Sequence, residues 1–503
     1  GNIKINGSKN NNFGFGNMNG FTAYGNYKTH HWNLYSSVNL NNRMRLNDGH
    51  RKVNTTYFAT DSTDYLDFSF TNASERVGKS IKFGADYMLN EHIEFNAEFN
   101  YDVHVHNGDN EQTFLQPEEK VRNTISEDFE DNYDLEGVIS MIHSFDNSDR
   151  EFSALYAYDY AKDRENEMLV HAEDLIDTTY LSENFNKYDL DISYLHPINE
   201  NSKFEFGYDG RFANNNEIMD FNISEEIDEY SINTFSGLNT FGYKRNIHSI
   251  FFEYSYALNE KFSIKPSFRF EYIDKKISFK KDLDENSGTN DIIYAELLDT
   301  TPDSIYEDSY SKFYPDLHFT YNLTDKQSIQ FGLSQRVNRP GDGGHGGGSR
   351  QIRPFPRDLY AENFIFVGNP FLKPEYSTQY DLSFKSPMPM GFGYVNLYYH
   401  QLTNIIEWYD DDRFENSDIL TFKNADSGEN FGVELFTMVM GQTIGGGYNY
   451  QKMEDPSGDY ELNGNSQRIM LYNRINFPEK YIKLFSFEFG FFFMKIAVPG
   501  GDL

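Results

Sequence analysis

The stretch from Lys79 to His106 constrains the fold of this chain more than any other. Its second half alternates strictly between apolar and polar side chains, and successive side chains in a β-strand point to opposite sides. One face carries Ile93, Phe95, Ala97, Phe99, Tyr101, Val103 and Val105, and the other carries Glu94, Asn96, Glu98, Asn100, Asp102, His104 and His106. Strands in globular proteins are usually about five or six residues long, and this run is more than twice as long. The pattern predicts lipid on one side of the strand and water on the other.

Composition agrees with one large membrane sheet. Of the 503 residues, 46 are Phe and 37 are Tyr, and aromatic side chains favour strands. No run of about eighteen consecutive apolar residues occurs, so no transmembrane helix is expected. A transmembrane β-barrel leaves only a weak alternating signal and therefore fits the mean hydropathy of −0.68.

Charge and cysteine content exclude several classes of function. The chain has no cysteine, which removes thiol catalysis, iron–sulfur clusters, cysteine zinc sites and disulfides. Its formal net charge of −34 would repel phosphates, so nucleic acid is not an expected partner. No signal peptide is visible in the opening GNIKINGSK, so an exported protein would be represented here without its true N-terminus.

Alternating runs joined by tight corners recur along the whole chain. Corners on one side, such as Leu89 to His92 and Asn199 to Ser202, are short and rich in Asn, Asp, Gly and Ser. The other connections are long and acidic, and they are expected near residues 107–126, 161–178, 216–232, 273–311 and 339–376. This asymmetry is typical of an outer-membrane barrel with short periplasmic turns and long external loops.

The fold class predicted is therefore all-β, a transmembrane antiparallel barrel that forms one domain over residues 1–503. The corners predict about nineteen strands up to Ile496, whereas single-chain bacterial barrels usually have an even number. We therefore expect this domain to be incomplete, with further strands downstream.

Motifs for catalysis are weak. His345 to Gly348 matches the His-Gly-Gly-Gly oxyanion-hole motif of some lipases, but no Gly-x-Ser-x-Gly nucleophile elbow accompanies it. Paired carboxylates such as Glu94 and Glu98 are abundant, and nothing in their spacing marks a glycosidase acid and nucleophile. We expect no catalytic residues, and the protein is not predicted to be an enzyme.

Two segments could be considered for metal binding. Asp282 to Asn286 begins like a calcium loop, but Ile293 stands where the bidentate Glu belongs. His104 and His106 share a face with Asp102, although a polar ladder facing the lumen explains them more simply. Neither a metal site nor a cofactor is predicted.

Residues 336–375 read RVNRPGDGGHGGGSRQIRPFPRDLYAENFIFVGNPFLKPE. Arg339-Pro340 after a strand, then Gly368 to Pro370 and Leu372 to Glu375 before the next strand, resemble the barrel part of TonB-dependent outer-membrane receptors. In particular, these segments resemble the Bacteroidota-type outer membrane protein beta-barrel family. Phe422 to Leu435 is similar to that family's Asn…Gly-Val-Glu segment, and GNIKINGSK to its first barrel strand after the plug.

This resemblance implies a barrel of roughly twenty-two strands filled by an N-terminal plug. It implies uptake of a bulky nutrient, such as a siderophore, peptide or oligosaccharide, across the cell outer membrane of a Gram-negative bacterium. The implied partners are outer-membrane lipid, a TonB-type energy coupler, and a surface lipoprotein or other outer-membrane subunits. A non-transporting structural or accessory barrel in a larger outer-membrane assembly remains the alternative.

The connection from Arg339 to Pro374 is the predicted recognition element. It concentrates arginine and aromatic side chains in an acidic chain, and this pairing anchors many binding sites. The candidate ligand- or partner-binding residues are Arg339, Arg350, Arg353, Phe355 and Arg357. The alternative is that these arginines neutralise the acidic lumen and neighbouring loops.

Overall fold

The computed structural model describes fifteen segments of the chain. They are residues 2–12, 16–57, 62–116, 123–145, 149–172, 175–228, 231–284, 303–341, 351–355, 365–388, 391–410, 419–439, 442–454, 461–476 and 486–497. In these segments no helix is long and apolar enough to cross a membrane.

The described residues form one sheet of twenty strands. The first ten are β1 (Asn2–Asn12), β2 (Gly16–Lys28), β3 (Trp32–Tyr57), β4 (Ser62–Asn90), β5 (Ile93–Gln116), β6 (Asn123–Ser144), β7 (Glu151–Ala172), β8 (Leu175–Asn199), β9 (Ser202–Asp228) and β10 (Ser231–Ala257). The others are β11 (Phe262–Leu283), β12 (Ser304–Thr324), β13 (Gln327–Asn338), β14 (Ile365–Phe366), β15 (Glu375–Met388), β16 (Gly391–Asp410), β17 (Ile419–Val439), β18 (Gln442–Glu454), β19 (Glu461–Asn476) and β20 (Ser486–Ala497).

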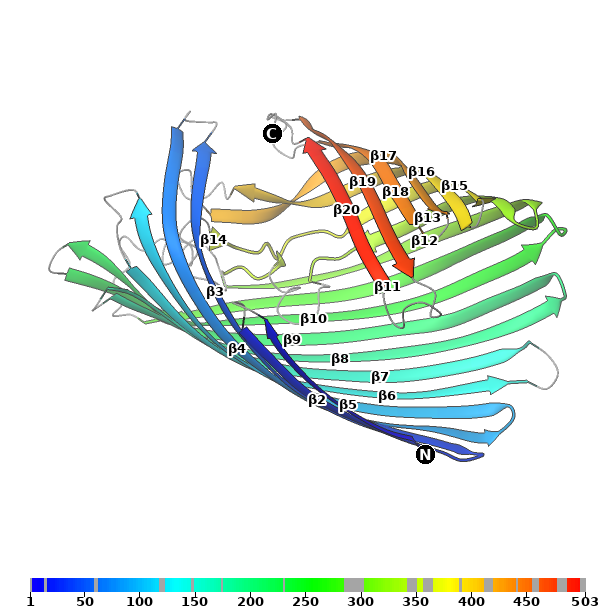
Figure 1. Ribbon diagram of the computed structural model, residues 1–503, viewed down its shortest axis with the longest axis horizontal. Coiled ribbons are helices and arrows are strands. Elements are labelled where there is room, and N and C mark those ends of the chain that lie inside the picture. Colours follow the sequence, from blue (N-terminus) through cyan, green and yellow to red (C-terminus); the bar gives the residue numbers. More distant parts are fainter. Residues whose placement is uncertain are drawn as a thin grey trace.

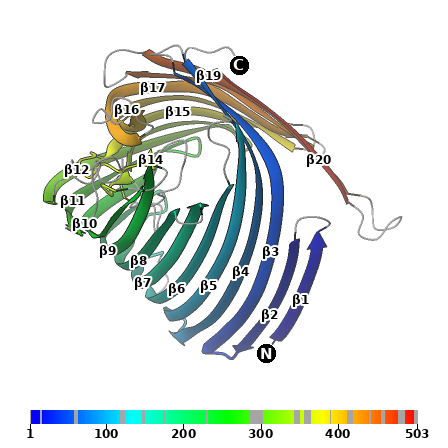
Figure 2. The same cartoon turned by 90° about the vertical axis from the view of Figure 1, so that its left-hand side faces the viewer.

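The sheet is an antiparallel meander in sequence order (Figure 1). The two-residue strand β14 is the exception, because it runs parallel to the start of β17. Without β14, nineteen of the twenty described strands make up the wall, which confirms the predicted fold class and strand number. Within the described residues, β1 pairs only with β2 and β20 only with β19, so the curled sheet has two free edges (Figure 2).

The strands are longer than a membrane requires. A transmembrane strand needs about 9–11 residues, whereas β3 to β11 each contain 22 to 29 residues. The predicted loops at 107–126, 161–178 and 216–232 are consequently wrong for most of their length. The reason is that β5 continues to Gln116, β7 to Ala172 and β9 to Asp228. The strands continue through these polar segments. Beyond the bilayer the outward polar side chains are exposed to water, and the backbone hydrogen bonds between neighbouring strands continue.

The polarity of the two faces of β11 inverts where the strand leaves the bilayer. In its first part the outward Phe268 and Phe270 are exposed, and the inward Glu271 is buried and charged. After Tyr272 the pattern reverses, because the inward Ile277 is 2% exposed and the outward side chains are polar. The first part of β11 therefore has lipid on its outward side and water on its inward side. The second part lies outside the bilayer, where its outward side chains meet water and its inward side chains form an apolar core.

Aromatic side chains line the outward face across neighbouring strands. Phe252 on β10, Phe268 on β11 and Phe313 on β12 lie in a row, with ring centroids 5.9 and 5.5 Å apart. At the end with short corners, the ring centroids of Trp32 and Tyr87 lie 4.4 Å apart with the rings tilted by 34°. Such aromatic bands mark the membrane interfaces of outer-membrane barrels.

Candidate functional site

The connection between β13 and β15 folds into the barrel, where its described segments are 339–341, 351–355 and 365–374. Two of these segments are joined by backbone hydrogen bonds. The N–H of Gly368 donates to the carbonyl of Arg353 at 2.8 Å, and that of Asn369 donates to the carbonyl of Gln351 at 2.8 Å. This connection is called the inner loop below.

Arg353 attaches the inner loop to the opposite wall. Its Nη1 donates to Oε1 of Glu217 on β9 at 2.6 Å, and the two side chains are only 2% and 0% exposed. Its Nε donates to the carbonyl oxygen of Phe355 at 3.2 Å. Both charged groups are buried away from water, so each is stabilised mainly by the opposite charge of the other.

Apolar side chains of the inner loop fill the upper lumen. Ile352 and Phe355 are 0% and 1% exposed, and the Phe355 ring lies 5.6 Å from that of Phe279 on β11. The cluster around them consists of Leu181, Met219, Phe221, Phe235, Phe241, Tyr243, Ile277, Phe279 and Val367. This packing explains why the inward face of β8 to β11 becomes apolar beyond the bilayer.

Arg339 begins the inner loop and is also buried. Its guanidinium contacts the carboxylate of Glu271 and donates to the Tyr314 hydroxyl at 3.4 Å. Gly341 follows with φ of +82°, and a Cβ there would lie 2.8 Å from Cδ1 of Ile352. Glycine is therefore required at this turn by its backbone angle and by the close approach of Ile352.

Residues 368–375, which contain the motif that resembles the family, connect the inner loop to β16 and β17 by hydrogen bonds. The Asn369 amide donates to the Phe422 carbonyl at 2.9 Å. Asn424 accepts from the N–H of Lys373 at 2.8 Å and donates to the carbonyl of that residue at 3.0 Å. Glu375 accepts from the N–H of Ile406 at 3.0 Å. These residues fix the end of the loop and the start of β15.

The structure brings three of the five predicted site residues together and buries them. Arg339, Arg353 and Phe355 are 6%, 2% and 1% exposed, and the two guanidinium groups contact wall carboxylates. Arg350 and Arg357 lie outside the described residues. These contacts favour the interpretation that the arginines neutralise acids of the lumen, and binding through them stays a prediction.

A recess of about 600 Å³ lies in the lumen wall below Arg339. The charged residues that line it are Arg211, Arg269, Arg336, Arg339, Glu253, Glu271 and Asp316. Four arginines and three carboxylates line this recess, and the carboxylate of Asp209 contacts two of these arginines, so its charges are close to balance.

The arginines of this recess differ in their partners. Arg211 binds Asp209 through two hydrogen bonds of 3.0 and 2.8 Å, and Arg269 reaches the same carboxylate at 2.9 Å. Arg336 is exposed to the recess and makes no hydrogen bond or ion pair with any described residue. It is the guanidinium that remains available to an incoming anion. Arg336 was not among the predicted site residues. The alternation of side chains along the run from Gln327 to Asn338, which puts Arg336 on the same face as Ser334, could have indicated it.

The histidine candidates lie in a polar ladder. Nδ1 of His106 is 3.0 Å from Asp128 and 4.0 Å from Glu130 on the next strand. No group of three or more metal-ligating side chains gathers in the part of the chain that the structure describes. Most of the calcium-like segment after Asp284 lies outside that part.

A long-stranded antiparallel wall, with outward aromatic bands, a charged lumen and an inner loop, defines an outer-membrane β-barrel protein. The model of the outer membrane protein beta-barrel family matches residues 143–497, which is more than half of the sequence. The chain belongs to this family, and its place is the outer membrane of a Gram-negative cell, in contact with membrane lipid.

Solved structures agree with the fold. The siderophore receptor PiuA from Acinetobacter baumannii matches with a TM-score of 0.54 at 10% identity, over 99% of this chain and 75% of that one. The ferric yersiniabactin uptake receptor FyuA from Yersinia pestis matches with a TM-score of 0.51 at 10% identity, over 97% and 71%. Likeness at this identity concerns the fold alone. Among curated proteins, no sequence matches this chain.

Proposed function

We propose that this chain is the barrel of a TonB-dependent receptor that takes up a bulky nutrient across the outer membrane. The observation that carries the proposal is the charged lumen recess beneath the inner loop, because Arg336 leaves a cation available inside the passage. Guanidinium groups bind carboxylates, phosphates and hydroxyl-rich ligands in a defined geometry. A siderophore, peptide or oligosaccharide with acidic groups suits such a recess.

The inner loop supports this function by its position. It narrows the external half of the lumen, where Arg353 and Phe355 pack against the far wall. A nutrient that enters from outside would meet this loop before it reaches Arg336. Uptake would then require energy passed from the inner membrane through a plug and a TonB-type coupler. We further infer that strands beyond those described close the barrel, because lipid cannot satisfy the unpaired backbone groups at a free sheet edge.

A growth experiment tests the proposed function. The gene is deleted, and the deletion strain is supplied with iron only as ferric siderophore, with nitrogen only as peptide, or with carbon only as oligosaccharide. We expect growth to fail in one of these media and to return with the wild-type gene but only weakly with Arg336→Ala. Growth in all media, together with stoichiometric co-purification of another outer-membrane protein, would instead support the accessory barrel.

A further inference from the structure

The outer wall contains a recess of about 500 Å³ near the external ends of β5 to β9, and we call it the external recess. Two neighbouring rows of cross-strand partners form its surface. The first row is Asn107, Phe129, Asn166, Tyr180 and Asp220. The second row lies two residues further out on each strand and includes Asp109, Glu127 and Met168. None of these residues lines the lumen recess.

The strand register places the external recess on the outward side of the wall. Glu217 on β9 contacts Arg353 of the inner loop, so it faces the lumen. Side chains alternate along a strand, so Asp220, three residues later, faces outward. Cross-strand partners share a face, and the whole row that contains Asp220 is therefore outward.

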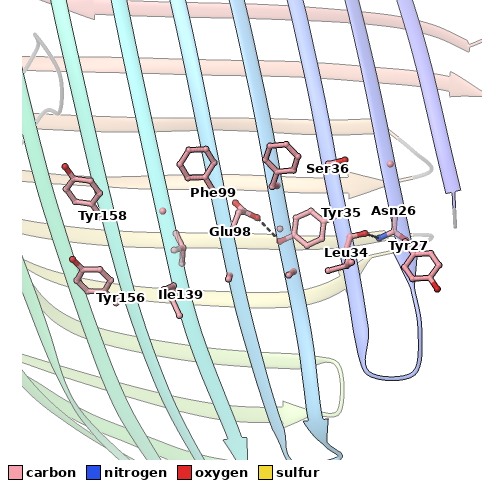
Figure 3. Close-up of a pocket in the computed structure, with 17 residues that line it drawn as sticks. Asn26, Tyr27, Leu34, Tyr35, Ser36, Glu98, Phe99, Ile139, Tyr156 and Tyr158 are labelled. Carbon is pink, nitrogen blue, oxygen red and sulfur yellow. Dashed lines mark hydrogen bonds between the residues drawn. The ribbon is translucent and has the colours of Figure 1, made fainter.

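The external recess lies beyond the bilayer. On β7 the outward side chains are mostly aromatic up to Tyr160, and Figure 3 shows Tyr158 within this membrane part. Asn166 lies six residues beyond Tyr160, which is about 20 Å at about 3.3 Å per residue. On β5 the apolar outward run ends at Val105, and the next outward residue is Asn107. The recess therefore begins at the membrane surface on β5 and stands clear of the acyl chains on β7.

Three carboxylates lie at the edges of the external recess. Asp109 and Glu127 are direct cross-strand partners on β5 and β6, and Asp220 lies at the other side on β9. None of the three makes a hydrogen bond or ion pair with a described residue, and no Lys or Arg is among the described residues that line the recess. Arg164 on the same outward face is bound to Asp131. Like charges directly opposite each other destabilise a sheet, so a cation from another molecule would stabilise Asp109 and Glu127.

The middle of the external recess is apolar and aromatic. Phe129 and Tyr180 are 40% and 39% exposed, and Met168 lies on the strand between theirs. Beyond the bilayer no acyl chain covers these side chains, and aromatic residues and Met are enriched at protein interfaces. Asn166 and Thr178 beside them offer hydrogen-bonding groups for a peptide backbone. The external recess thus has an apolar centre between acidic edges.

The acidic edges are spaced for an extended peptide. Glu127 on β6 and Asp220 on β9 are three strand spacings and one row apart, which is about 16 Å. In an extended peptide, residues i and i+4 are about 13 to 14 Å apart and share a face with residue i+2. The long side chains of Lys or Arg span the remaining distance.

We propose that the external recess docks a basic segment of a neighbouring surface protein. The segment carries cationic residues at i and i+4, which contact Glu127 and Asp220, and an apolar residue at i+2, which packs on Phe129, Met168 and Tyr180. The carboxylates would repel phosphate groups, so an anionic headgroup does not suit the recess. The partner stands beside the barrel and not over its mouth, so this contact does not depend on the proposed uptake.

Peptide binding tests the external recess. The probe is the dye-labelled peptide Lys-Ser-Phe-Ser-Lys with blocked ends, and its fluorescence anisotropy is measured as the full-length protein in detergent is added at low salt. Saturable binding is expected. Asp220→Lys should raise the dissociation constant about tenfold, because an attraction becomes a repulsion. Asp274→Lys makes the same charge change on the outward face of β11, in the row of Phe212 outside the recess, and should leave the dissociation constant unchanged.

A charge swap separates docking from general attraction to an acidic chain. The peptide Glu-Ser-Phe-Ser-Glu should not bind the wild-type protein but should bind the double variant Glu127→Lys with Asp220→Lys. Phe129→Ser should weaken binding of the basic peptide without changing the net charge. Glu127→Lys replaces Asp220→Lys in the first test if the latter loses heat-modifiable gel mobility and so fails to assemble.

Several results would overturn this assignment of the recess. They are equal binding of the basic peptide to Asp220→Lys and Asp274→Lys, and failure of the acidic peptide to bind the double variant. Wild-type dimers in detergent that Asp220→Lys disperses would assign the recess to a second copy of this chain. Binding of neutral maltohexaose that excludes the basic peptide would assign it to a glycan.

Discussion

The buried pair between Arg353 and Glu217 should control the docking of the inner loop. The variant Arg353→Met keeps most of the aliphatic stem but leaves the carboxylate of Glu217 without its cation. Breaking a buried ion pair on one side typically costs about 3 to 5 kcal/mol. Solvent does not screen this pair, since the two side chains are 2% and 0% exposed. We expect the loss to appear as release of the loop, because the barrel wall does not depend on Arg353.

Hydrogen exchange measures that release at defined amides. The N–H groups of Gly368 and Asn369 are hydrogen-bonded to the carbonyls of residues 353 and 351. We expect these bonds within the loop to open when Arg353 no longer holds residues 351–355 against Glu217. A cost of about 3 kcal/mol corresponds to more than a hundredfold increase in the opening equilibrium. Peptides that cover residues 365–374 should therefore exchange about a hundredfold faster in Arg353→Met. Peptides from the membrane part of β11 should not change.

A double variant separates the charge effect from packing. Replacing both partners, as in Arg353→Met with Glu217→Leu, removes the uncompensated charge, and buried pairs are often replaced by apolar residues at little cost. Exchange of residues 365–374 should then return to within about tenfold of wild type. If Arg353→Met exchanges at the wild-type rate, or if the double variant exchanges as fast as the single one, the ion pair does not hold the loop in place.

Four further outcomes are expected. Phe99→Arg places a charge on the lipid face and should lower the unfolding free energy by about 2 to 4 kcal/mol in a lipid refolding titration, whereas Asn96→Arg on the lumen face should be tolerated. Gly341→Ala should destabilise the docked loop by about 1 to 2 kcal/mol, seen as faster exchange of residues 351–355, because φ is +82°. Arg336→Ala should weaken nutrient binding by purified receptor in calorimetry, with heat-modifiable gel mobility unchanged. Intact mass spectrometry of protein from outer membranes should give more than 58.7 kDa, and a mass equal to that value would contradict barrel closure by further strands.

Much of the wall could be predicted from the sequence because strand alternation and corners are local signals. The run from Ile93 to Val105 and the corner at Leu89 to His92 are found where they were expected, in β5 and at the end of β4. The same local signals did not predict where the strands end outside the bilayer. Apolar and polar side chains go on alternating past Tyr272, although the apolar face changes sides there. The alternation therefore predicts that the strand has two faces but not which face points into the barrel.

The inner loop could not be predicted because its contacts are distant in sequence. Arg353 and Glu217 are 136 residues apart, and no spacing rule joins them. The arginine and aromatic content of the loop was recognised, but composition does not distinguish a ligand contact from a buried ion pair. The Gly368 to Glu375 motif likewise identified the family before the structure explained it as an attachment to β16 and β17.

Energised uptake by whole cells distinguishes a transporting receptor from an accessory barrel. Cells that carry the wild-type gene are given the radiolabelled nutrient selected by the growth experiment, with and without a protonophore. For a TonB-dependent receptor, we expect accumulation that requires this gene, stops when the protonophore removes the proton gradient, and falls in cells with Arg336→Ala. Accumulation that is equal in the deletion strain, or that continues with the protonophore present, would contradict uptake by this receptor.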